Sequence, residues 1–160
     1  ISNNSAVSDY GGGGGMYCQD SNPTLTNVTI SGNTASYFGG GICCASSSPT
    51  LTNVTISDNS VSYSAGGGGM FCVSSSPSLV NCILWNDSPQ EIYVNSGSVT
   101  ATYSDIEGGF TGTGNINSDP SQLPSISDNS ISVSARNFFL LSDISLNIGN
   151  IFFEFTKNYL

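Results

Sequence analysis

The chain carries little charge, very few basic residues and no histidine. Of its 160 residues only 2 are Lys or Arg against 11 Asp or Glu, which gives a formal net charge of −9. The scarcity of basic side chains excludes a basic patch, so nucleic acid and anionic membrane surfaces are not expected partners. Without histidine or a CxxC pair, the common zinc sites and a histidine general base are excluded. No apolar run is long enough to predict a membrane span.

What the chain does have is 19 glycines and an internal repeat. Segments 11–33, 39–59 and 66–87 each run from a glycine stretch through Cys and a Ser/Asn-Pro turn to an Asn-centred strand. Landmarks recur after 26 and 28 residues, as Pro23, Pro49 and Pro77 do, and a weaker fourth copy follows. Such a period is typical of stacked structural units. Because Ile1 falls part-way through a unit, we expect the chain to be a fragment of a longer protein.

Apolar and polar residues alternate with period 2 inside each copy, which predicts strands and not helices. Three short strands cannot bury a core alone, so we predict an all-β fold, a right-handed parallel β-helix (solenoid) of about four to five coils over residues 1–120. Equivalent apolar residues would stack as inward columns, namely Met16, Ile42 and Met70; Cys18, Cys44 and Cys72; Leu25, Leu51 and Leu79; Val28, Val54 and Cys82; Ile30, Ile56 and Leu84. The alternation breaks at Asn27, Asn53 and Asn81, so these asparagines are predicted to form a hydrogen-bonded ladder at a turn.

The five cysteines are an odd number, and four of them fall on inward positions of the predicted strands. Their parallel Cβ vectors would suit a disulfide poorly, so we expect Cys18, Cys44, Cys72 and Cys82 to pack as small apolar side chains. A disulfide or a metal site stays as the alternative. Cys43 is predicted to face outward, beside Tyr17 and Phe71.

The segment 121–160 reads as a divergent tail. It keeps one glycine, loses the repeat register and holds both basic residues, Arg136 and Lys157. Two interpretations stay open. The tail caps the last coil, whose open edge would otherwise invite association, or it is a non-native reading frame.

The repeats resemble those of secreted right-handed parallel β-helix proteins, and are similar to the repeats of polymorphic outer membrane proteins. That pattern pairs a GG[AG]I-type strand with a short Ile/Phe-x-x-Asn strand, here Gly40–Ile42 with Ile56–Asn59. Segment 112–120 is similar to the stretch that closes the regular array in such proteins. The resemblance covers residues 1–120 and implies an extracellular or cell-surface location, with signal and anchor outside this fragment.

No catalytic set stands out in the repeats. Enzymes on this fold use clusters of carboxylates, together either with Ca²⁺ and a basic residue or with a histidine. In this chain there is no histidine, and both basic residues lie in the tail. Asp58 and Asp87 would lie near one turn on adjacent coils. We expect these two carboxylates to lie in a solvated loop and not to form a Ca²⁺-binding pair. The glycine runs lack the Lys-Ser/Thr of a phosphate loop and are read as corners with positive φ. We therefore expect no catalytic, metal or cofactor site in this segment.

Aromatic side chains offer the best candidate binding surface. Tyr17 and Phe71 share an outward register, and Trp85 takes an exposed one. Tyr10, Tyr37 and Tyr63 recur before the glycine runs. Such rings bind sugars or proteins, or they simply cover neighbouring coils.

These observations favour a non-catalytic structural or adhesive segment that binds a glycan or a protein of a host or neighbouring cell. The first alternative is a non-catalytic part of a polysaccharide lyase or hydrolase of the pectate-lyase type. A minor alternative is ice binding by the Thr-x-Thr pairs at Thr24, Thr50 and Thr100, although Ser78 and Val80 break that array.

Overall fold

The computed structural model describes residues 1–7, 12–63 and 66–121. Tyr10 and the predicted tail, with its two interpretations, lie outside the described residues apart from Ser121. Within the described part every regular element is a strand. No helix long and apolar enough to cross a membrane occurs among these residues.

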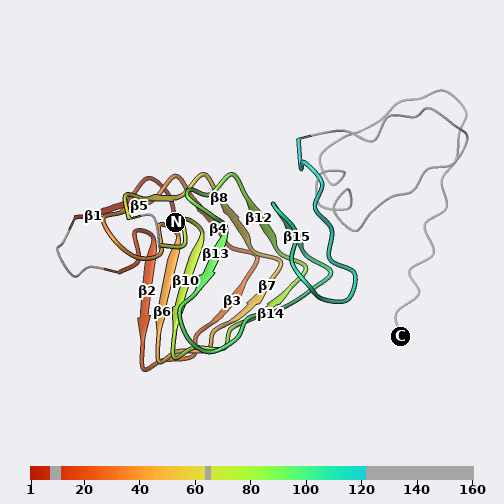
Figure 1. Ribbon diagram of the computed structural model, residues 1–160, viewed down its shortest axis with the longest axis horizontal. Coiled ribbons are helices and arrows are strands. Elements are labelled where there is room, and N and C mark those ends of the chain that lie inside the picture. The colour runs from red at the N-terminus through yellow and green to blue at the C-terminus, as the bar shows by residue number, and fades with distance from the viewer. Residues whose placement is uncertain (8–11, 64–65, 122–160) are drawn as a thin grey trace, which may run out of the picture. The chain divides into compact units, whose positions relative to one another are not determined.

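The strands stack into four parallel sheets, three of four strands and one of three strands, in a solenoid of about four turns (Figure 1). One sheet, which we call the aromatic sheet, holds β2 (Met16–Gln19), β6 (Ile42–Ala45), β10 (Met70–Val73) and β13 (Ile92–Val94). The threonine sheet holds β3 (Thr24–Thr26), β7 (Thr50–Thr52), β11 (Ser78–Val80) and β14 (Thr100–Thr102). The third sheet holds β4 (Thr29–Ser31), β8 (Thr55–Ser57), β12 (Ile83–Trp85) and β15 (Asp105–Ile106). A short fourth sheet joins β1 (Ser5–Ala6), β5 (Thr34–Ala35) and β9 (Ser60–Val61).

The pairing registers confirm four of the five predicted columns, since Val28, Val54 and Cys82 lie outside the paired strands. Ile42 pairs with Met16 and Met70, Leu51 with Leu25 and Leu79, and Ile56 with Ile30 and Leu84. The members of these columns in the middle coils are fully buried, as Ile42, Leu51 and Ile56 are. Because each coil supplies one rung, the core is a continuous apolar rod that no coil could bury alone.

The strands are joined by tight corners at which one residue takes the left-handed backbone conformation. Asn27, Asn53 and Asn81 occupy one such corner, with φ of 57°, 56° and 54°. Asparagine tolerates this conformation better than most residues with a side chain. Asn81 Nδ2 donates to Asn53 Oδ1 at 2.7 Å, and Asn53 Nδ2 donates to Asn27 Oδ1 at 3.1 Å. The predicted asparagine ladder is thus confirmed, and we call it the corner ladder.

The glycine runs are needed for two reasons, a positive-φ corner and the close approach of neighbouring coils, and the sequence predicted only the corner. Gly13 and Gly39 have φ of 67° and 57°, as a positive-φ corner requires. The next glycines are needed because neighbouring coils approach closely. A Cβ on Gly40 would lie 2.5 Å from the carbonyl oxygen of Gly68 and 2.6 Å from Ser60 N. Any side chain there would push the coils apart.

The inward cysteines pack as predicted. Cys18, Cys44, Cys72 and Cys82 are free thiols with exposed fractions of 2% or less. Burial, and then the neighbouring Cys44, raises the pKa of Cys18 to about 11. The neighbouring Cys72 and burial raise the pKa of Cys44 as well. The thiols of Cys18 and Cys44 therefore stay protonated at neutral pH, and all four inward cysteines pack as core residues.

A second polar ladder runs inside the solenoid and was not predicted. Asn33 and Asn59 are completely buried, and Asp87 is 7% exposed. Asn59 Oδ1 accepts from both the backbone N and Nδ2 of Asn33, at 3.0 and 2.9 Å. Asp87 Oδ1 accepts the same two bonds from Asn59, at 2.7 and 2.9 Å. We call Asn4, Asn33, Asn59 and Asp87 the inner ladder, since Asn4 donates to Asn33 in the same way.

The inner ladder corrects one expectation. Asp58 is exposed, as a solvated loop requires, but Asp87 is buried. The reason is the register, because Asp87 follows Asn33 and Asn59 in the inner column while Asp58 lies at the outer corner beside Asn86.

Candidate binding groove on the aromatic sheet

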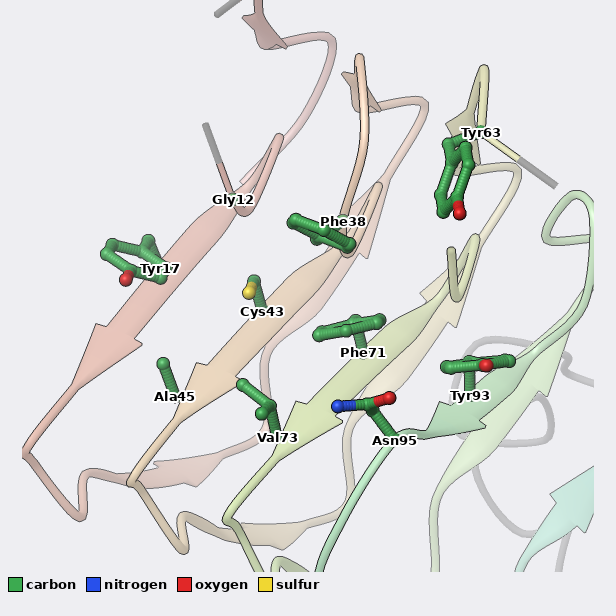
Figure 2. Close-up of a pocket in the computed structure, with 10 residues that line it drawn as sticks. All are labelled: Gly12, Tyr17, Phe38, Cys43, Ala45, Tyr63, Phe71, Val73, Tyr93 and Asn95. Carbon is green, nitrogen blue, oxygen red and sulfur yellow. The ribbon is translucent and has the colours of Figure 1, made fainter. Parts of the chain in front are cut away.

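The outer face of the aromatic sheet carries a row of side chains in one register. Tyr17 on β2 pairs with Cys43 on β6, Cys43 with Phe71 on β10, and Phe71 with Tyr93 on β13. Figure 2 shows these four side chains projecting from the same face of neighbouring strands. Since strands lie about 4.8 Å apart, the small Cys43 leaves a gap in a row of rings.

Two rings from the loops overhang this row. Phe38 lies against Phe71 with ring centroids 4.5 Å apart, and Tyr63 meets Phe38 edge-on at 6.3 Å. Tyr37 packs beside Tyr63 at 6.0 Å. Phe71 also stacks on Tyr93 at 5.7 Å with their planes 6° apart. The loop rings therefore belong to the same aromatic cluster as the strand rings.

The row and the overhanging rings line a groove that is open to solvent and has a volume of about 420 Å³ (Figure 2). Its lining combines rings with small or polar side chains and holds no charged residue: Gly12, Tyr17, Phe38, Cys43, Ala45, Tyr63, Phe71, Val73, Tyr93 and Asn95. The floor is low over β6, because Cys43 and Ala45 are smaller than their neighbours on β2 and β10. This volume lies in the usual range of small-molecule pockets.

The rings differ in how much surface they offer. Tyr17 is 51% exposed and Tyr63 is 47% exposed, whereas Phe71 is buried under the cluster. Tyr17 Oη donates to Gln19 Oε1 at 3.0 Å, which orients the ring on the sheet. Tyr17 and Tyr63 are therefore the rings that a ligand can reach, and Phe71 supports them.

Cys43 faces outward, as predicted, but it is not exposed. The overlying residues leave only 3% of it accessible, and a Cβ on Gly12 would lie 2.7 Å from its Sγ. Burial, and then the neighbouring Cys44 and Cys18, raises the pKa of Cys43 to about 12. The thiol is protonated at neutral pH and is not an activated nucleophile.

The structure brings together four of the six residues singled out from the sequence. Tyr17, Phe71 and Tyr63 line the groove, and Tyr37 packs on Tyr63 beside it. Trp85 lies apart, on β12 of the third sheet beside Ser57. Tyr10 is outside the described residues.

Among the groove residues that sequence reasoning missed are two rings, Tyr93 and Phe38, and one amide, Asn95. Tyr93 could have been found, because its copy of the repeat aligns it with Phe71. Asn95 could have been found in the same way, because it directly follows β13 and so continues that strand into the register of Val73. Phe38 lies in the loop before a glycine run, and no pattern marks it.

Among the described residues, no three His, Cys, Asp or Glu side chains gather in a way that could hold a metal ion. The groove therefore offers rings, amides and hydroxyl groups as its means of contact.

Parallel sheets stacked coil upon coil define the class of protein, a parallel β-solenoid. A family model described as "right handed beta helix region" matches residues 1–137, which is most of the chain. The chain belongs to this right-handed β-helix family. No curated protein and no solved structure matches it.

Proposed function

We propose that this chain is a non-catalytic segment of a secreted or cell-surface β-helix protein whose aromatic groove binds a neutral glycan. The observation that carries the proposal is an open groove bordered by reachable tyrosine rings and free of charged side chains. We place the segment in the adhesive, surface-displayed class that its likeness to polymorphic outer membrane protein repeats suggests.

Sugar rings have apolar C–H faces and polar edges, and the groove has both kinds of partner. Tyr17 and Tyr63 offer ring surface, while Asn95 offers an exposed amide at the rim. Tyrosine suits such a place because one side chain provides an apolar body and a polar tip. A protein side chain could use the same rings, which makes a surface protein the second type of partner.

The charge of the chain favours a neutral glycan over an anionic one. Lys and Arg do not occur before position 136, and the formal net charge is −9. A uronic-acid polymer would meet repulsion and no bidentate Arg contact. The pectate-lyase-type alternative, in which the segment is a non-catalytic part of an enzyme, implies such an anionic polymer and is therefore the weaker one. Ice binding is not proposed, because Ser78 and Val80 interrupt the threonine sheet.

A glycan array followed by titration calorimetry tests the proposal. Neutral glucan, galactan and xylan oligosaccharides are compared with oligogalacturonate, using the wild type, Tyr17→Ala and Tyr103→Ala. Tyr103 is a matched control, since it is 58% exposed and lies away from the groove, at the corner that follows β14 of the threonine sheet. We expect a neutral oligosaccharide to bind, and Tyr17→Ala to weaken its Kd about tenfold, the size of one good ring contact.

Three outcomes would contradict this reading. Binding of oligogalacturonate alone would favour the lyase-type alternative. Silence across all glycans would point to a protein partner or a spacer. Release of reducing or unsaturated sugar ends would show that the segment is catalytic.

A further inference from the structure

The inner ladder ends on a pair of buried carboxyl groups. In every rung the amide of one coil donates to the side-chain oxygen of the next coil, so the last rung needs only acceptors. Asp87 supplies them, with both bonds from Asn59 converging on Oδ1. Across a short turn, Asp87 N donates to Glu91 Oε1 at 3.0 Å. Glu91 then leads into β13, and its carbonyl oxygen accepts from Met70 N at 2.8 Å.

Each of these two carboxyl groups keeps one buried oxygen without a hydrogen-bond partner. These atoms are Asp87 Oδ2 and Glu91 Oε2, on side chains only 7% and 6% exposed. The space for them comes from Gly69, where a Cβ would lie 2.5 Å from Asp87 Oδ2. Two adjacent carboxylates cannot both stay ionised at such depth without a compensating charge, whereas one bound proton lets one group donate to the other.

No cation of the described residues acts on the pair. The described side chains include no Lys or Arg, and the N-terminal amine of Ile1 donates to the carbonyl oxygen of Thr29. The other groups that face the pair are acidic too, namely Asp58 after β8 and Glu107 after β15. No set of three described ligands suits a metal ion.

We propose that Asp87 and Glu91 share one bound proton, and that this proton fastens the start of β13 to the third coil. The pair is thus a proton-binding site that closes the inner ladder. It makes the last coil firmest in acid and weaker as the proton is lost.

The electrostatics of the pair agree with this assignment. Burial, and then the neighbouring Asp87, raises the pKa of Glu91 to about 9. Burial raises the pKa of Asp87 to about 6, while its bonds to Glu91 and Asn59 oppose the rise. At neutral pH the pair therefore holds one proton. Two coupled groups titrate as a pair, so the two steps belong to the pair as a whole.

The direction of the pH effect follows from these shifts. The ordinary pKa values of the two groups are 3.8 and 4.5, so the folded state binds more protons than the unfolded state from about pH 4 to about pH 9. The stabilising contribution is therefore complete below about pH 4 and is lost as the pH rises through the two folded values.

Thermal unfolding of the full chain at a series of pH values tests the proposal. Circular dichroism reports the whole solenoid, and the single tryptophan, Trp85, reports the coil that carries Asp87. For the wild type we expect the midpoint to fall from about pH 4 to about pH 9, and the upper step of this fall, from about pH 6 to about pH 9, comes from the proton that the pair holds at neutral pH. Glu91→Gln carries an amide that donates to Asp87 at every pH, so its midpoint should lose the upper step, the fall from about pH 6 to about pH 9.

Glu107→Gln is the matched control, because Glu107 is an exposed carboxyl that faces Glu91. It should keep the upper step and lower its pH slightly. An unchanged upper step in Glu91→Gln would overturn the proposal. If that variant fails to fold, carbon-detected NMR titration of the wild-type carboxyl groups decides. One of the pair still protonated at about pH 7 supports the shared proton, and both ionised below about pH 5 overturns it.

Discussion

The corner ladder and the inner ladder place the same amino acid at one-coil intervals in opposite surroundings. Asn53 of the corner ladder is half-buried and Asn27 is exposed, whereas Asn33 and Asn59 are completely buried. Water can replace a bond in the first ladder but not in the second. A recurring asparagine therefore does not by itself reveal how much the fold depends on it.

The two ladders also bond in opposite directions. Corner asparagines donate toward the earlier coil, and inner asparagines donate toward the later one. Corner backbone N–H groups bond to backbone carbonyls, as Asn53 N does to Val80 O. Inner backbone N–H groups depend on the side chain of the next rung. The inner side chains thus satisfy buried backbone groups that no strand reaches.

Replacing an inner rung should have the largest effect. Asn59→Ala removes the acceptor of two bonds from Asn33 and the donors to Asp87 and to the Ile30 carbonyl oxygen. Because these groups are buried, we expect the free energy of unfolding to fall by about 3 kcal/mol or more. Urea unfolding measures the change. A loss below about 1 kcal/mol, the size of one exchanged hydrogen bond, would mean that water reaches the inner ladder.

A pair of corner variants separates backbone strain from hydrogen bonding. Asn53→Gly keeps a residue that accepts φ of 56° and loses only the ladder bonds, so we expect a cost of less than about 1 kcal/mol. Asn53→Ala adds a left-handed alanine, which costs about 1 kcal/mol more. The same urea titration compares them. Equal stability of the two variants would show that the backbone of this corner is not strained.

The sequence predicted the architecture because period and alternation are local signals that every coil repeats. The columns through Ile42, Leu51 and Ile56 and the corner at Asn53 followed from spacing alone. The inner ladder was within reach, since Asn33 and Asn59 share the Ile-x-x-Asn step. The burial of the inner ladder could not be predicted, because the alternation does not say whether a polar side chain at a corner points into the core or toward solvent.

The groove was only partly predictable for a different reason. Strand register placed Tyr17 and Phe71 together, and the same register would have added Tyr93. Phe38 reaches the groove from a loop, and loop conformation depends on contacts between coils that no single copy encodes. Asp87 and Glu91 lie close together because the connection from β12 to β13 is shorter than the corresponding connections of the earlier coils, and the sequence does not say that this turn buries them.

The fourth rung of the corner ladder offers the smallest expected effect, and it is a gain. Tyr103 follows Thr102 as Asn81 follows Val80, and its φ is 51°. Tyr103→Asn would relieve the strain and let its amide donate to Asn81 Oδ1, in the direction that the ladder already uses. The ring of Tyr103 contacts Gly114, so some packing is lost. We expect a net stabilisation of about 0.5 to 1 kcal/mol in urea unfolding.

Tyr103→Gly serves as the control for this gain, because glycine relieves the strain without adding a rung. If the corner ladder contributes at all, Tyr103→Asn should be the more stable of the two variants. Equal stability would leave backbone relief as the whole effect, and the corner ladder would then be a consequence of the left-handed corners and not a cause of them. A less stable Tyr103→Asn would show that the ring against Gly114 outweighs both terms, and that this corner is held by packing where the three before it are held by asparagine.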